Sequence, residues 1–114
     1  MNYMQSITGG EAVVKSLIMH GVDTVFGLPG LQNDALYNAF YDNRSSVRVV
    51  HTRHEQGAAY MALGYALSRD EPGVYNVVPG PGFLNTTAAL STAYATNAKV
   101  LCLTGQIPSA YIGR

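Results

Sequence analysis

A single glutamate, Glu55, is the first candidate for chemistry, because it begins a predicted helix directly after an apolar strand. Ala59, Ala62 and Ala66 share its helix face, and no other charged side chain occurs in the helix before Arg69. A face of small residues permits close approach by another helix, which we expect to come from another chain. A carboxylate beside such a contact would be desolvated, which suits proton sharing with a ligand. A first-turn carboxylate that only stabilises the helix dipole is an equally good interpretation.

The run Gly80-Pro81-Gly82-Phe83-Leu84-Asn85 nearly fits a dinucleotide fingerprint. That fingerprint would carry Gly or Ala in place of Asn85 and an acidic residue about 20 positions later. Residues 98–106 contain no Asp or Glu, which argues against a nucleotide site. Two alternatives stay open. The run is either a tight turn whose glycines serve backbone geometry, or a loop that approaches a flat ligand, with Asn85 at a helix start as a polar contact.

The cysteine and histidines point to no metal site. Cys102 is the only cysteine and lies in an apolar run, so a disulfide framework and a paired-cysteine metal site are excluded. We expect its thiol to be buried and unreactive. His51 and His54 have no third ligand nearby in the sequence, so we predict no bound metal.

Composition restricts the class of partner. Seven Lys and Arg balance seven Asp and Glu, and this zero net charge argues against nucleic-acid binding. No run reaches the 18 apolar residues of a membrane span and no signal peptide begins the sequence, so we expect a cytoplasmic protein with no membrane contact. Charged residues make up 12% of the chain, against about 25% in an ordinary domain. Part of the surface is therefore expected to be covered by a partner.

The elements that must position these residues alternate between helix and strand. The first helix begins at a capping box, Thr8 with Glu11, and stops at Gly21. Helices are further predicted at 33–41, 54–68 and 83–96, strands at 24–27, 47–51, 74–78 and 99–104, and a loop at 105–114. Apolar strands that alternate with helices predict an α/β fold. We expect a parallel sheet with helices on both faces, a flavodoxin-like or Rossmann-like layer that is incomplete.

Ligands of open parallel sheets bind at the carboxyl ends of the strands. Four predicted junctions lie at that edge, and each is rich in glycine or polar residues: 27–30, 51–55, 79–82 and 105–106. The sequence therefore predicts a binding site at this edge of the sheet.

Taken in order, five segments of the chain resemble the N-terminal pyrimidine-binding domain of thiamine diphosphate enzymes: 24–30, 53–59, 64–66, 80–85 and 104–106. The resemblance covers residues 6–114. It is closest to the acetolactate synthase and pyruvate oxidase branch. The run Gly27-Leu28-Pro29-Gly30 has no His or Asp, which disfavours a benzaldehyde-lyase-like or pyruvate-decarboxylase-like site.

The resemblance implies a catalytic role for Glu55. In this family the glutamate hydrogen-bonds N1′ of the aminopyrimidine, and protonation there prepares the ring to remove the thiazolium C2 proton. The resemblance assigns cofactor contacts to six further residues: Pro81, Gly82 and Asn85 beside the pyrimidine, Pro29 and Gly30 near the reacting carbon, and Gln106 at a neighbouring polar position.

The same resemblance implies that residues 1–114 hold half of a cofactor site in a truncated domain. The family binds diphosphate and Mg²⁺ through a Gly-Asp-Gly…Asn segment of a separate domain, and no such segment occurs here. We expect the diphosphate-binding domain of a second subunit to complete the site in a homo-oligomer. The complete enzyme would decarboxylate a 2-oxo acid such as pyruvate and transfer the two-carbon unit, whereas this chain alone would be inactive.

The residues present specify neither an acceptor nor FAD. The alternative functions are a non-catalytic or split-subunit partner domain and a flavodoxin-like nucleotide-binding module.

Overall fold

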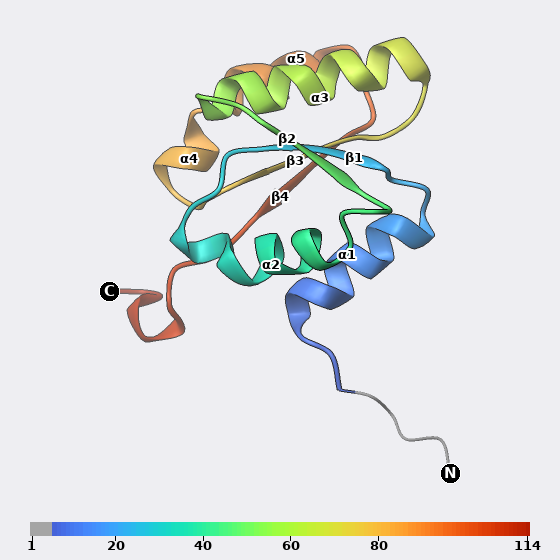
Figure 1. Cartoon of the computed structure of the whole chain (residues 1–114). Coiled ribbons are helices and arrows are strands. Elements are labelled where there is room, and N and C mark those ends of the chain that lie inside the picture. The colour runs from blue at the N-terminus through green and yellow to red at the C-terminus, as the bar shows by residue number, and fades with distance from the viewer. Residues whose placement is uncertain (1–5) are drawn as a thin grey trace.

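A computed structural model describes residues 6–114 and contains a four-stranded, all-parallel sheet with helices on both faces (Figure 1). The strand order is β2-β1-β3-β4. The strands are β1 (Thr24–Gly27), β2 (Arg48–His51), β3 (Gly73–Val77) and β4 (Val100–Thr104). The predicted α/β fold is confirmed. All four predicted strands exist, with ends shifted by one residue at most.

Helices α1 (Gly9–Met19) and α2 (Asp34–Asp42) cover one face of the sheet, below it in Figure 1. The predicted capping box is present, with the Thr8 hydroxyl accepting from the Glu11 N–H and the Glu11 carboxylate accepting from the Thr8 N–H. Gly21 follows the helix with φ +78°, a conformation that favours glycine. The core on this face comprises Val14, Leu17, Val25, Ala39, Phe40, Val47 and Val74.

The opposite face is covered by α3 (Glu55–Arg69) and α5 (Thr87–Ala95). The alanine face of α3 was expected to contact another chain, and that expectation is wrong. Ala59 and Ala62 are buried against Tyr75 and Val77 of the chain's own sheet. The close approach has a local cause, because a Cβ at Gly73 would overlap the Ala62 carbonyl. The small side chains bring α3 down onto β3.

The single helix predicted at 83–96 is two helices, the short α4 (Pro81–Leu84) and α5. Asn85 therefore follows α4 instead of starting a helix. The break is held by Thr86, which is fully buried. Its hydroxyl donates to the Phe83 carbonyl at 2.7 Å and accepts from the Tyr75 hydroxyl at 2.9 Å. These bonds compete with a continuous helix and turn the chain between α4 and α5.

Two short 3₁₀ helices complete the described chain. The first, η1 (Leu31–Asn33), precedes α2, and the second, η2 (Ser109–Tyr111), lies in the segment that was predicted to be a loop. Among residues 6–114, no helix is long and apolar enough to cross a bilayer. The strand order reverses direction between β1 and β3, so the carboxyl ends of these two strands form the topological switch point where ligands of such sheets bind.

Candidate functional site

Glu55 and Asn85 meet at the carboxyl edge of the sheet although 30 residues separate them. The Asn85 side-chain amide donates to Glu55 Oε2 at 3.0 Å. Glu55 is the first residue of α3, and the preceding His54 caps the helix by accepting from the Gln56 N–H at 3.1 Å. Among residues 6–114, no ion pair involves Glu55, which is half-buried. The carboxylate is held by a neutral donor and by no cation.

The second carboxylate oxygen of Glu55 lies beside Gly82, where Val78 occupies the space that a side chain would take. A Cβ at the buried Gly82 would lie 3.6 Å from Glu55 Oε1 and 2.6 Å from Val78 Cγ2. The loop reaches this position because Gly80 adopts φ +65° and Pro81 then begins α4. Of the predicted pyrimidine contacts, Gly82 and Asn85 adjoin Glu55, and Pro81 is an exposed residue of the same short helix.

The loop after β1 packs against the same valine. A Cβ at Gly30 would overlap Val78 Cγ1, so Gly30 and Gly82 lie on two sides of one side chain. Pro29 is exposed next to it. Val78 thus joins the two predicted glycine loops, and sequence analysis did not single it out. Its place directly after a buried strand and before Pro79-Gly80 was the available signal.

Gln106 is not joined to the Glu55–Asn85 pair by any hydrogen bond within residues 6–114. Its side-chain Oε1 accepts from the N–H of Ile107 at 2.9 Å, and the residue is exposed. The preceding Gly105 packs against the loop at the start of α2, where a Cβ would overlap Asn33 Oδ1. The fourth predicted junction therefore lies beside η1.

A buried pair of asparagines lies between these loops and was missed by sequence analysis. Asn33 Nδ2 donates to Asn76 Oδ1 at 3.1 Å and to the Val77 carbonyl at 2.8 Å. Asn76 Nδ2 donates to the Leu103 carbonyl at 2.9 Å, so the pair connects η1, β3 and β4. The signal was a polar residue in the middle of an apolar strand, because a buried amide needs partners.

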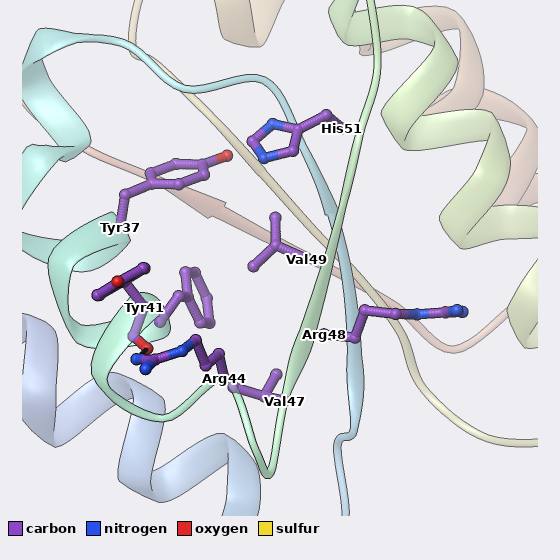
Figure 2. Close-up of a pocket in the computed structure, with 8 residues that line it drawn as sticks. Tyr37, Tyr41, Arg44, Val47, Arg48, Val49 and His51 are labelled. Atoms are coloured by element: carbon purple, nitrogen blue, oxygen red, sulfur yellow. Dashed lines mark hydrogen bonds between the residues drawn. The ribbon is translucent and has the colours of Figure 1, made fainter.

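A hollow of about 380 Å³ lies between α2 and the edge strand β2, outside the predicted site (Figure 2). At its upper end in Figure 2 the Tyr37 ring stacks on His51, with ring centroids 6.3 Å apart. The Tyr37 hydroxyl is buried and has no hydrogen-bond partner in the described chain. Burial raises the pKa of Tyr37 to about 12. The hydroxyl is therefore neutral at ordinary pH.

No metal cluster is present within residues 6–114, where no three His, Cys, Asp or Glu side chains gather. The Cys102 thiol is half-buried, less enclosed than expected. Burial raises its pKa, which keeps it protonated and unreactive at neutral pH.

A family model described as "Thiamine pyrophosphate enzyme, N-terminal TPP binding domain" matches residues 7–114. The chain belongs to this family. The resemblance found in the sequence is thereby confirmed. The matched residues include Glu55, Gly82 and Asn85. This edge of the sheet is therefore part of the domain that the family model describes.

Relatives of this TPP-binding domain agree with the acetolactate-synthase-like branch. The acetolactate synthase of Arthrospira platensis is 40% identical over 112 residues, and a probable acetolactate synthase large subunit of Methanocaldococcus jannaschii is 43% identical over 105 residues. These matches cover 96% and 92% of the chain. A probable 2-ketoarginine decarboxylase of Pseudomonas aeruginosa is 42% identical over all 114 residues. The chain spans 20% of the length of the decarboxylase, 19% of the Arthrospira protein and 17% of the Methanocaldococcus protein.

Proposed function

We propose that this chain supplies the pyrimidine-binding half of a thiamine diphosphate site, with Glu55 as its catalytic residue. The observation that carries the proposal is the arrangement around the Glu55 carboxylate. One oxygen accepts a hydrogen bond from the neutral Asn85 amide, and the other faces Gly82, which has no side chain. A carboxylate in this state can accept or share a proton without competition from a neighbouring cation.

The residues present fit the aminopyrimidine ring. Gly82 adds no side chain beside Glu55 Oε1, so a flat ring placed there would meet the carboxylate, the backbone and Val78. Gly30 packs closely on the other side of Val78, and we propose that this contact holds the loop after β1 near the reacting carbon. The proposed contacts with the cofactor are completed by Pro29, Pro81, Asn85 and Gln106.

When bound, thiamine diphosphate supplies the electron sink for decarboxylation. The residues of this chain would bind and orient its pyrimidine end. Glu55 would hold a proton between its Oε1 and the ring nitrogen, which is general acid–base work. Gly82 and Pro81 would support the ring from the backbone. The hydrophobic Val78 would exclude water from the gap between the two loops.

The proposed substrate is a 2-oxo acid, and pyruvate is the donor that the acetolactate-synthase-like branch favours. The name of the Pseudomonas relative also denotes a decarboxylase of a 2-oxo acid. We propose that the diphosphate and Mg²⁺ are held by a domain outside this chain, on a second subunit of a homo-oligomer. A cytoplasmic location belongs to the same proposal.

A second candidate is a split-subunit or non-catalytic partner domain, which would hold the same half-site. Both candidates predict that the chain alone binds thiamine diphosphate weakly. Calorimetry with thiamine diphosphate and Mg²⁺ should detect no tight complex, and submicromolar affinity would contradict the half-site.

The decisive test is Glu55→Gln in a protein that carries this chain together with its diphosphate-binding half. We expect 2-oxo acid decarboxylation to fall by a factor of about 10² or more, because the proton-sharing group is lost. The matched control is Glu71→Gln, an exposed carboxylate outside the site. Near-normal turnover in the Glu55 variant, with the control unchanged, would remove the proposed mechanism.

A further inference from the structure

The Glu55–Asn85 hydrogen bond distinguishes the two oxygens of the carboxylate. Oε2 accepts from Asn85 Nδ2 at 3.0 Å, while Oε1 lies on the side of Gly82. A glutamate side chain at the first position of a helix has several rotamers, and an unanchored carboxylate could present either oxygen. The bond to Asn85 fixes which oxygen lies on the side of Gly82.

The position of Asn85 follows from the break between α4 and α5. The Asn85 N–H donates to the Pro81 carbonyl at 3.0 Å, which closes the short α4. The next residue, Thr86, is fully buried and bonded to the Tyr75 hydroxyl of β3 at 2.9 Å. Asn85 is therefore attached on one side to a turn of helix and on the other to the sheet. In a continuous helix this side chain would have a different direction.

We propose that Asn85 is a positioning residue for Glu55, which holds Oε2 by a neutral hydrogen bond so that Oε1 is free to share a proton. This role is additional to the cofactor contact proposed for Asn85 above, because here the amide acts through the glutamate. The amide suits this task because it orients the carboxylate without adding a charge, whereas Lys or Arg would stabilise the ionised form much more strongly. The catalytic meaning of the inference rests on the proposed function.

The first test is the pH dependence of the Asn85 side-chain amide resonances in the NMR spectrum of the chain without cofactor. These resonances should move with pH, because the carboxylate that accepts the hydrogen bond from this amide loses its charge when it takes up a proton. In Glu55→Gln the movement should be lost. The matched control is Asp34→Asn, which removes an exposed carboxylate from α2 and should leave the movement intact. Movement that persists in Glu55→Gln would overturn the inference.

The second test measures the rotamers of Glu55 through its side-chain scalar couplings. The wild type should show one dominant rotamer, and Asn85→Ala should show averaged couplings. Asn85→Gln retains a donor and should restore part of the order. Asn38→Ala, at an exposed asparagine of α2, is the control for general effects. Couplings that stay the same in Asn85→Ala would contradict the positioning role.

Backbone amide spectra would report the fold of each variant. The Glu55→Gln measurement leaves Asn85 intact, so it decides the question even if Asn85→Ala does not fold. Neither test contains thiamine diphosphate. A failure here would therefore remove the positioning role alone. A failure of the decarboxylation test would remove the proposed function, and with it the catalytic meaning of the Glu55–Asn85 bond, but not the bond itself.

Discussion

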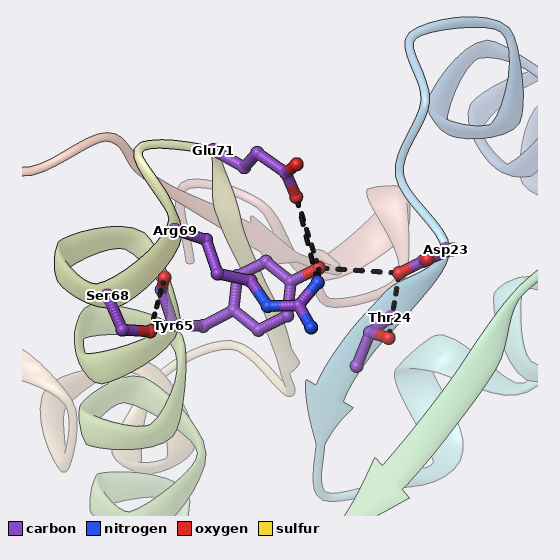
Figure 3. Close-up of polar contacts among 6 residues, drawn as sticks. All are labelled: Asp23, Thr24, Tyr65, Ser68, Arg69 and Glu71. Atoms are coloured by element: carbon purple, nitrogen blue, oxygen red, sulfur yellow. Dashed lines mark hydrogen bonds and ion pairs between the residues drawn. The ribbon is translucent and has the colours of Figure 1, made fainter.

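The two ends of the sheet satisfy their polar groups in different ways. At the amino end, charged and phenolic side chains pair with one another in solvent (Figure 3). The Tyr65 hydroxyl lies 3.4 Å from carboxylate oxygens of Asp23 and Glu71, and the Arg69 guanidinium lies over the Tyr65 ring. At the carboxyl end, neutral amides are buried and bonded to strand carbonyls.

The polar groups at the two ends therefore differ in how much they contribute to stability. Exposed pairs at the amino end contribute little to stability individually, because water screens them. Buried amides at the carboxyl end are costly to disturb, since a lost partner leaves a polar group unsatisfied. At the same end of the sheet, Glu55 has no charged partner in the described chain. Its hydrogen bond comes from the neutral Asn85 amide, which leaves the second carboxylate oxygen without a cationic partner.

The largest effect should come from the buried amides. Asn76→Ala removes the acceptor of Asn33 Nδ2 and the donor to the Leu103 carbonyl. We expect the free energy of unfolding to fall by about 3 kcal/mol, measured by urea denaturation. Asn38→Ala, at an exposed position, should change it by less than about 0.5 kcal/mol. Equal losses in both variants would show that burial does not distinguish the two asparagines.

A smaller effect should follow from a methyl group at the proposed pyrimidine surface. Gly82→Ala places a Cβ 2.6 Å from Val78 Cγ2, so the valine must shift. We expect a loss of about 1–2 kcal/mol in the free energy of unfolding. Thiamine diphosphate affinity of the completed site should fall as well. Gly64→Ala is the control, because a Cβ there meets nothing within 4 Å. An unchanged affinity in Gly82→Ala would separate this surface from the cofactor.

Tyr37→Phe should stabilise the fold, because it removes a buried hydroxyl with no partner. The expected gain is about 1 kcal/mol by urea denaturation, within the range for one unsatisfied group. Tyr75→Phe removes the same atom from another tyrosine and should have the opposite effect on stability. Its hydroxyl donates to Thr86 at 2.9 Å, so we expect a loss of about 1 kcal/mol. A loss of stability in Tyr37→Phe would indicate that its hydroxyl has a partner.

The smallest effect concerns the exposed pair at the amino end. The Lys99 ammonium donates to Asp70 at 2.7 Å and lowers the pKa of that carboxyl, first by the hydrogen bond and then by its charge. A lowered pKa contributes stability above the unfolded value, about 3.9, which is lost as pH falls through the folded pKa.

We therefore expect Lys99→Met to move the NMR titration midpoint of Asp70 upward and to weaken the acid dependence of stability below about pH 4. Stability at pH 7 should change little, because the pair is exposed. An unmoved Asp70 midpoint would contradict the assigned cause.

The sequence predicted most of the fold because local signals agreed. Apolar strands, the Thr8–Glu11 capping box and the turns containing glycine gave the strand and helix order to within a few residues. The break at Thr86 was missed because it depends on the Tyr75 hydroxyl, which only the folded sheet brings near. The alanine face of α3 was assigned to another chain because helical spacing shows a small face without showing what packs on it.

The arrangement of the candidate site was predicted in part, whereas its role stays a prediction. Glu55, Gly82 and Asn85 were expected at one edge, and they adjoin one another there. The hydrogen bond from Asn85 to Glu55 was not expected, because the position of Asn85 depends on the break between α4 and α5. Val78 was missed because its packing against Gly30 and Gly82 joins segments that are far apart in the sequence. The Asn33–Asn76 pair was missed for the same reason.

The parallel topology also sets the order in which the site can form. Within residues 6–114 no hairpin is available, and every strand pairing must wait for a helical crossover to be closed. Asn33 must find Asn76 across 43 residues, and Asn76 must find the Leu103 carbonyl across another 27. During synthesis from the N-terminus, α1, β1, α2 and β2 emerge first. The hydrogen bonds of the Asn33–Asn76 pair can form only after β3 and β4 have emerged. The edge at which we propose that the cofactor binds is therefore a late product of folding.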